Sequence, residues 1–168
     1  MVRQLHVSDS GEPFLKKKIE TVKNKIGWNK PKDGFWTSTL IDDETSDWLN
    51  WSVNEGYYPN QTIKLWSLEV QDNAVVLVID NKDDYENALA LYERVEVDSN
   101  YQLRSFLDFE KISKDFHGLQ VTKNGLAENR TELYRWDVES TVWFDWCFTD
   151  VTYVSDIFVP EVKIELPF

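Results

Sequence analysis

Apolar and polar residues alternate with a period of two in the stretch WDVESTVWFDWCF, which begins at Trp136. Successive side chains of a β-strand point to opposite faces of a sheet, so this period predicts a strand. One parity is apolar except for Ser140 and predicts the core face: Trp136, Val138, Val142, Phe144, Trp146 and Phe148. Asp137 and Glu139 share the other parity. We therefore expect both carboxylates to project together from one face of the sheet.

Other strands are predicted where short apolar runs are bounded by turn residues. The expected strands are Val2–Val7, Phe35–Leu40, Thr62–Val70, Ala74–Asp80, Gly118–Thr122 and one or two within Val151–Leu166. Only a short polar turn separates residues 62–70 from residues 74–80. We expect these two strands to form a hairpin or to be neighbours in the sheet.

Helices are predicted where apolar residues recur every three or four positions. The expected helices are Pro13–Ile26, Asp42–Trp51, Asp83–Val95 and a shorter one at Phe109–Phe116. The polar stretch KNGLAENRTEL, which begins at Lys123, is predicted to be a loop before the strand that carries Glu139. This mixture, without internal repeats, predicts a single α+β domain over residues 1–168. Its sheet is expected to be mixed or mostly antiparallel, with flanking helices.

Composition narrows the class of partner. The chain has 30 acidic and 18 basic residues and a formal net charge of −12. It is rich in aromatic residues, with eight Trp, nine Phe and seven Tyr. Such a charge opposes nonspecific binding to nucleic acids and to anionic membranes. A domain of this kind is expected to be globular, with a substantial core.

The single cysteine, Cys147, excludes an internal disulfide, and the absence of an apolar run long enough for a membrane span or signal peptide leads us to expect a cytoplasmic protein. Two histidines and one cysteine are too few for a usual zinc site. The sequence also lacks a glycine-rich phosphate loop, so a P-loop or Rossmann nucleotide site is not expected.

Three short stretches combine residue types that carry chemistry: LHVS around His6, GFWTSTL at Gly34–Leu40, and DVEST at Asp137–Thr141. In this order, and with the pattern of helices and strands between them, they resemble the ADP-ribosyltransferase family. Members of that family carry a His or Arg on the first strand, a hydroxyl-bearing or Tyr element on a second strand, and a Glu on a later strand. The resemblance covers most of the chain and implies an ADP-ribosyltransferase-like fold.

The resemblance also implies roles. The first-strand residue would be His6 or Arg3; His6 shares its parity with polar residues and is the better candidate. The hydroxyl-bearing element would be Thr37, Ser38 and Thr39. Glu139 would be the catalytic carboxylate, and Asp137, two positions earlier, would contact the acceptor. NAD would be the substrate, and its ADP-ribose would pass to an unknown acceptor.

The chemistry of that reaction suits these residue types. Cleavage of the nicotinamide–ribose bond passes through an oxocarbenium-like state, which a carboxylate at Glu139 would stabilise. His6 would bind a ribose hydroxyl, and Ser38 would orient Glu139. Aromatic walls suit the flat nicotinamide ring, and the candidates are Trp36, Trp48, Tyr57 and Tyr58.

Two residues depart from the family pattern. Val7 stands where members of the family usually have a Gly after the His, which changes the expected shape of the pocket. Asp137 stands where they often have Gln or Glu, which leaves the acceptor open. Two other functions fit the same sequence. The chain could be a non-catalytic acidic protein that masks a basic partner surface. It could also bind a nucleotide or ADP-ribose without turning it over. A cleft that joins His6, Ser38 and Glu139 favours the enzyme, whereas carboxylates gathered on one surface favour the masking protein.

Overall fold

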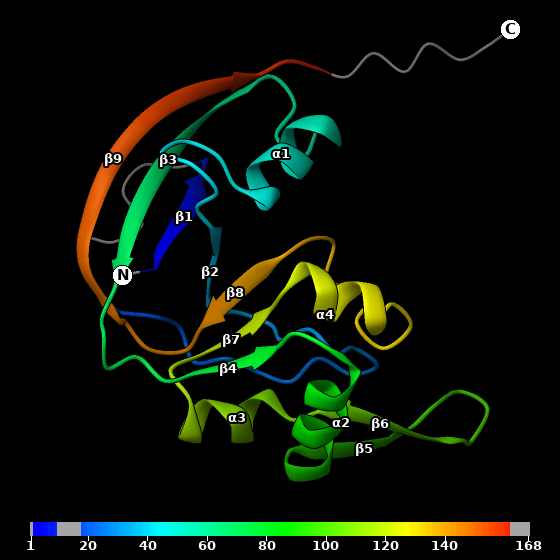
Figure 1. Ribbon diagram of the computed structural model, residues 1–168. Coiled ribbons are helices and arrows are strands. Elements are labelled where there is room, and N and C mark those ends of the chain that lie inside the picture. The colour runs from blue at the N-terminus through cyan, green and yellow to red at the C-terminus, as the bar shows by residue number, and fades with distance from the viewer. Residues whose placement is uncertain (1, 10–17, 162–168) are drawn as a thin grey trace, which may run out of the picture.

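A seven-stranded mixed sheet with the strand order β4-β7-β8-β2-β1-β3-β9 organises the molecule (Figure 1). The computed structural model describes residues 2–9 and 18–161. The strands of this sheet are β1 (Arg3–Ser8), β2 (Phe35–Thr39), β3 (Gln61–Val70), β4 (Val76–Ile79), β7 (Gly118–Val121), β8 (Ser140–Trp143) and β9 (Phe148–Val159). Every pairing is antiparallel except that of β4 with β7. The prediction of a single α+β domain is thus confirmed.

Four helices and a separate hairpin complete the described part of the chain. They are α1 (Asp47–Asn54), α2 (Lys82–Leu91), α3 (Phe109–Asp115), α4 (Lys123–Glu128) and the hairpin of β5 (Glu93–Val97) with β6 (Leu103–Leu107). In Figure 1, α1 lies beside the end of the sheet that contains β1 and β3, whereas α2 and α3 lie beside β4 and β7, and the hairpin lies next to α2. No helix in the described ranges has the length and apolar character that a membrane crossing requires.

Each helix begins at a residue whose side chain accepts a hydrogen bond from a backbone N–H of the first turn. These capping residues are Ser46, Asn81, Asp108 and Thr122. Such caps satisfy N–H groups that have no partner within the helix, so they fix where each helix starts.

The core lies on both faces of the sheet. At one end of the sheet, Leu49 of α1 packs with Leu5 and Ile63, so α1 is held against β1 and β3. At the other end, residues of α2 and α3 pack with Ile79 and Leu119 of the parallel pair. Strands covered on both faces lose the alternation of polar and apolar residues. This accounts for β8, in which all four residues are buried.

Several predicted elements need correction. The expected strand from Trp136 is regular only at 140–143, because residues 136–139 are not paired in the sheet and the chain turns again before β9. The strands β3 and β4 are neither a hairpin nor neighbours, since β4 pairs with β7 at the opposite edge. Nonlocal hydrogen bonding overrides the short connection between them.

The helical predictions were wrong in part. The expected helix Pro13–Ile26 lies partly outside the described residues, and residues 18–26 form no helix: Lys23 bridges Lys32 instead, and Ile26 is 85% exposed. The helix predicted from Asp42 begins only at Asp47, as α1. The residues before it form a loop, in which the Asp42 side chain accepts a hydrogen bond from the N–H of Thr45 at 2.8 Å.

Two more segments differ from expectation at the other end of the sheet. The predicted helix 83–95 ends at Leu91, where β5 begins two residues later. The predicted polar loop contains α4, and Gly125 explains its position. A Cβ at Gly125 would lie 2.1 Å from the carbonyl oxygen of Ile79, so only glycine lets this helix approach β4 so closely.

Candidate functional site

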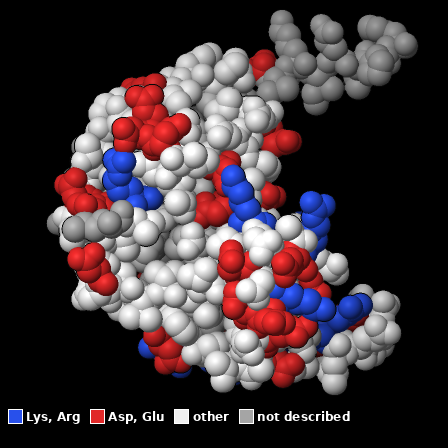
Figure 2. All heavy atoms as spheres, viewed as in Figure 1, with Lys and Arg blue, Asp and Glu red and all other residues white. Residues whose placement is uncertain are grey.

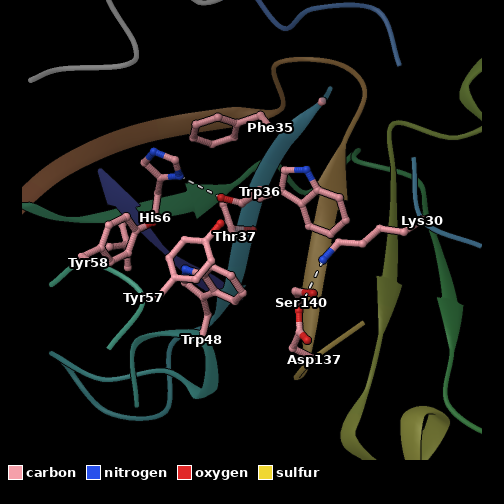
Figure 3. Close-up of a pocket in the computed structure, with 12 residues that line it drawn as sticks. His6, Lys30, Phe35, Trp36, Thr37, Trp48, Tyr57, Tyr58, Asp137 and Ser140 are labelled. Carbon is pink, nitrogen blue, oxygen red and sulfur yellow. Dashed lines mark hydrogen bonds and ion pairs between the residues drawn. The ribbon is translucent and has the colours of Figure 1, made fainter. Parts of the chain in front are cut away.

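A cavity of about 380 Å³ lies where β1, β2, the loop before β2, α1 and the segment before β8 meet (Figure 3). Its lining includes five residues predicted as site residues: His6, Trp36, Thr37, Tyr57 and Asp137. Trp48 and Tyr58, the other predicted aromatic walls, also line it. The sequence pattern thus located residues from four distant segments that the fold brings to one cavity.

His6 is held in a neutral state at this cavity. Its Nδ1 lies 2.8 Å from the carbonyl oxygen of Trp36, which can only accept, so Nδ1 carries the proton. The imidazole also stacks on Phe35 with 4.4 Å between ring centroids. Desolvation lowers the pKa of His6 to about 4. His6 therefore offers hydrogen bonds but no charge at neutral pH.

Aromatic side chains from α1 and the loop after it form one wall. Trp48 stacks on Trp51 at 5.1 Å, and Tyr57 meets the edge of Trp48 at 5.4 Å and of Tyr58 at 4.9 Å. Burial raises the pKa of Tyr58 to about 12, so its hydroxyl stays protonated. Stacked and edge-on rings of this kind present a surface suited to a flat, weakly polar group.

Lys30 and Asp137 lie on the other side of Trp36 (Figure 3). The Nζ of Lys30 is 3.7 Å from Oδ2 of Asp137 and 5.0 Å from the centroid of the Trp36 ring. It also donates a hydrogen bond to the carbonyl oxygen of Arg135 at 3.1 Å. Desolvation lowers the pKa of Lys30, and the charge of Asp137 opposes that shift.

Glu139 is buried, with 6% of its surface exposed, and both carboxylate oxygens are saturated by hydrogen bonds. Oε2 accepts from Ser38 Oγ at 2.7 Å and from the Thr39 N–H at 2.9 Å. Oε1 accepts from Thr39 Oγ1 at 2.8 Å and from Gln120 Nε2 at 2.9 Å. The expectation that Ser38 orients Glu139 thus corresponds to a direct contact between them.

Thr37 belongs to a second polar contact behind the cavity. Its hydroxyl donates to Gln4 Oε1 at 2.7 Å and accepts from Trp143 Nε1 at 2.8 Å.

Arg3, the alternative first-strand residue, forms an exposed ion pair with Asp43 at 2.6 Å. Of the two first-strand candidates, only His6 is among the residues that line the cavity.

Glu139 does not line the His6 cavity, and neither does Ser38. Glu139 instead lines a shallower hollow of about 390 Å³, which also includes Asp47, Asp80 and Lys123. The expectation that Asp137 and Glu139 project together was wrong, because residues 137–139 precede the regular strand and the alternation does not hold there. Neither of these two hollows, which are formed by described residues, joins His6, Ser38 and Glu139.

Two residues of this region were not predicted. Lys30 lies in the turn-rich sequence NKPKDG, where composition indicates only a loop. Gln120 is the one polar residue in the strand GLQV, and that interruption of an apolar run was the available signal. Neither residue is close in sequence to its partner, so the contact itself could not be foreseen.

Charge on the face shown in Figure 2 lies in several acidic groups with Lys and Arg among them, rather than in one continuous acidic surface. Within residues 2–9 and 18–161, no three His, Cys, Asp or Glu side chains are grouped so as to hold a metal ion. Comparison with protein-family models, with curated proteins and with solved structures finds no match for the chain. Its chemistry is therefore argued from its own geometry.

Proposed function

We propose that the protein is an ADP-ribosyltransferase-like enzyme that cleaves NAD and transfers ADP-ribose to an acceptor. The observation that carries this proposal is the hydrogen bonding of Glu139 to Ser38 and Thr39, next to the cavity that His6 lines. Hydroxyls on the neighbouring strand fix the starting position of this carboxylate beside the cavity.

The Glu139 network and the cavity are directly connected. Asp137 and Ser140, on either side of Glu139 in the chain, line the cavity. The backbone N–H of Trp48, another lining residue, donates to the Ser38 hydroxyl at 3.3 Å. In the proposed reaction the nicotinamide ring lies against the aromatic wall, and the Glu139 side chain rotates toward the ribose as positive charge develops there.

Silent binding is the second candidate function, and the saturation of Glu139 favours it. Four donors already occupy the two oxygens, so contact with a ribose would require at least one of these hydrogen bonds to be exchanged. In this alternative the cavity holds a nucleotide or ADP-ribose, and Glu139 serves only to join β2, β7 and β8.

Incubation of the purified protein with NAD, with nicotinamide release followed by chromatography, tests the enzyme proposal. Glu139→Gln is the critical variant, and Asp145→Asn is the matched control, because Asp145 is an exposed carboxylate of the same segment outside both hollows. Circular dichroism must first show that each variant is folded at the assay temperature. Release by the wild type and the control, abolished in Glu139→Gln, supports the enzyme.

The other outcomes separate the two candidates. Binding of NAD by calorimetry without nicotinamide release establishes the silent binder. If NAD is neither bound nor cleaved, the enzyme proposal is overturned, and titration with ADP-ribose and AMP then tests the silent binder. Binding of neither leaves the acidic masking protein as the remaining hypothesis. Release that persists in a folded Glu139→Gln variant contradicts the assigned role of Glu139.

A further inference from the structure

We propose that Lys30 recognises a phosphate group of the ligand in the aromatic cavity, and that the phosphate displaces Asp137 from Lys30. The inference deepens the proposed function and rests on it for the identity of the nucleotide. It changes the role of Asp137 from acceptor contact to built-in counter-ion of Lys30.

The backbone that presents Lys30 is fixed from three directions through the buried residue Asn29. The Asn29 side chain accepts from the Leu107 N–H at 2.7 Å and donates to the Tyr85 hydroxyl at 3.0 Å. The main-chain carbonyl oxygen of Asn29 accepts from Trp136 Nε1 at 2.5 Å. A charged group on such a rigid support binds with little ordering cost.

Lys30 is the one Lys or Arg among the described residues that line the cavity. The other basic side chain there, His6, is uncharged at neutral pH for the reason given above. An anionic group that enters the cavity therefore has a single cationic partner. The aromatic wall of Trp48, Tyr57 and Tyr58 lies on the opposite side of Trp36 (Figure 3). A flat ring at one end and a cation at the other suit a nucleotide.

The pairing of Lys30 with Asp137 is loose enough to exchange. Charge-assisted hydrogen bonds between ammonium and carboxylate groups are usually about 2.7–2.9 Å long, whereas this pair is separated by 3.7 Å. The Asp137 side chain is 40% exposed, so it is readily solvated when it moves away. An ammonium has three donors. Among the described residues, the Lys30 ammonium has one contact as short as 3.1 Å, its hydrogen bond to the carbonyl oxygen of Arg135.

Phosphate is the expected anion because it must compete with a carboxylate already in place. The diphosphate of NAD carries two charges in total, and the phosphate monoester of a mononucleotide carries up to two. Either offers at least three acceptor oxygens, so it gains more from a partly desolvated ammonium than Asp137 does. A ligand with a flat ring but no phosphate leaves the Lys30–Asp137 pair intact. The cavity should therefore discriminate a nucleotide from its nucleoside.

Calorimetric titration with two ligand pairs tests this: nicotinamide mononucleotide against nicotinamide riboside, and AMP against adenosine. In wild-type protein we expect the phosphorylated member of at least one pair to bind about tenfold more tightly, as one charge-assisted hydrogen bond allows. Lys30→Gln should bring that ratio near one without weakening the nucleoside. Asp137→Asn should widen it about threefold, because it removes the competing charge.

Lys82→Gln is the control, since Lys82 is an exposed lysine on α2 and its loss changes the net charge equally. Lys30→Arg should keep most of the discrimination. If Lys30→Gln weakens nucleotide and nucleoside equally, or if neither pair shows a phosphate preference in the wild type, the inference is wrong even where NAD is turned over. A Lys30-dependent preference for AMP in a protein that neither binds nor cleaves NAD would support the inference and overturn the proposed function.

Discussion

Asp137 and Glu139 are separated by one residue, yet their carboxylates lie in opposite surroundings. Glu139 is buried and accepts four hydrogen bonds from β2 and β7 at 2.7–2.9 Å. Asp137 is half-exposed, and its one ion pair in the described structure is the 3.7 Å contact with Lys30. The contrast shows how one segment can supply both a fixed carboxylate and an exchangeable one.

The difference has a structural cause. β8 begins at Ser140, so Glu139 is at the point where the chain enters the sheet between β2 and β7 and can reach donors on both neighbours. Asp137 is still outside the sheet, where water and the Lys30 loop are its surroundings. Burial therefore makes the first carboxylate a part of the fold, whereas exposure leaves the second free to respond to a ligand.

The largest effect is expected from Glu139→Gln. An amide can present its oxygen to only one pair of donors, so its NH₂ group faces the other pair whichever way it is turned. We expect the free energy of unfolding to fall by about 2–4 kcal/mol, as for a buried charged network that loses one partner. Urea denaturation at pH 7, followed by tryptophan fluorescence, measures it. A loss below about 1 kcal/mol would show that the network contributes little.

Acidification tests the burial of His6, which lines the same cavity as Asp137. The unfolded chain binds a proton on this residue near pH 6.5, whereas the folded protein binds it only near pH 4, because burial disfavours the imidazolium. Stability should therefore fall as the pH decreases from about 6.5 to about 4, and His6 should account for about 2 kcal/mol of that loss.

The variant His6→Asn isolates this contribution, since an amide can still donate to the Trp36 carbonyl but does not titrate. Urea denaturation of both proteins at pH 7.5 and pH 4.5 gives two differences in the free energy of unfolding. Between pH 7.5 and pH 4.5, the free energy of unfolding of the wild type should fall by about 2 kcal/mol more than that of the variant. Equal losses would mean that His6 is as easily protonated in the folded state as in the unfolded chain.

Thr141 and Thr37 allow a buried hydroxyl without a hydrogen-bond partner to be compared with one that has partners. The Thr141 hydroxyl is buried, and its oxygen has no hydrogen-bond partner among the described residues. Its cross-strand neighbour Thr37 has two partners, Gln4 and Trp143. Replacing Thr141 with Val should raise the free energy of unfolding by about 1 kcal/mol, whereas Thr37→Val should lower it by about 1–2 kcal/mol. Thermal unfolding of both variants decides this; a destabilised Thr141→Val would contradict the difference.

Local patterns allowed much of the fold to be predicted. Alternation and turn residues located β1, β2, β3 and β7 to within two residues at each end, and the 3.6-residue period located α3. The parallel pairing of β4 with β7 could not be predicted, because it depends on contacts between segments about forty residues apart in sequence. The short helix α4 was hidden by its polar composition.

The candidate site was predictable in its residue types and in one contact. The resemblance implied that Ser38 orients Glu139, and the two side chains are in contact. The parity rule failed at Glu139 itself, because it assumes a regular strand where the chain has none. Gln120 and Lys30 act through tertiary contacts with Glu139 and Asp137, and nothing in their own neighbourhoods in sequence indicates those partners.

The smallest effect on stability is expected from Asp137→Asn. The ion pair with Lys30 is long and half-exposed, and such pairs contribute about 0–1 kcal/mol. Removal of Asp137 also leaves Lys30 with its hydrogen bond to Arg135, so no cation is left without a partner. We expect a change below about 0.5 kcal/mol in urea denaturation. A loss as large as that of Glu139→Gln would mean that Asp137 is also held by the fold, and it would contradict the easy displacement of Asp137 from Lys30 by a ligand.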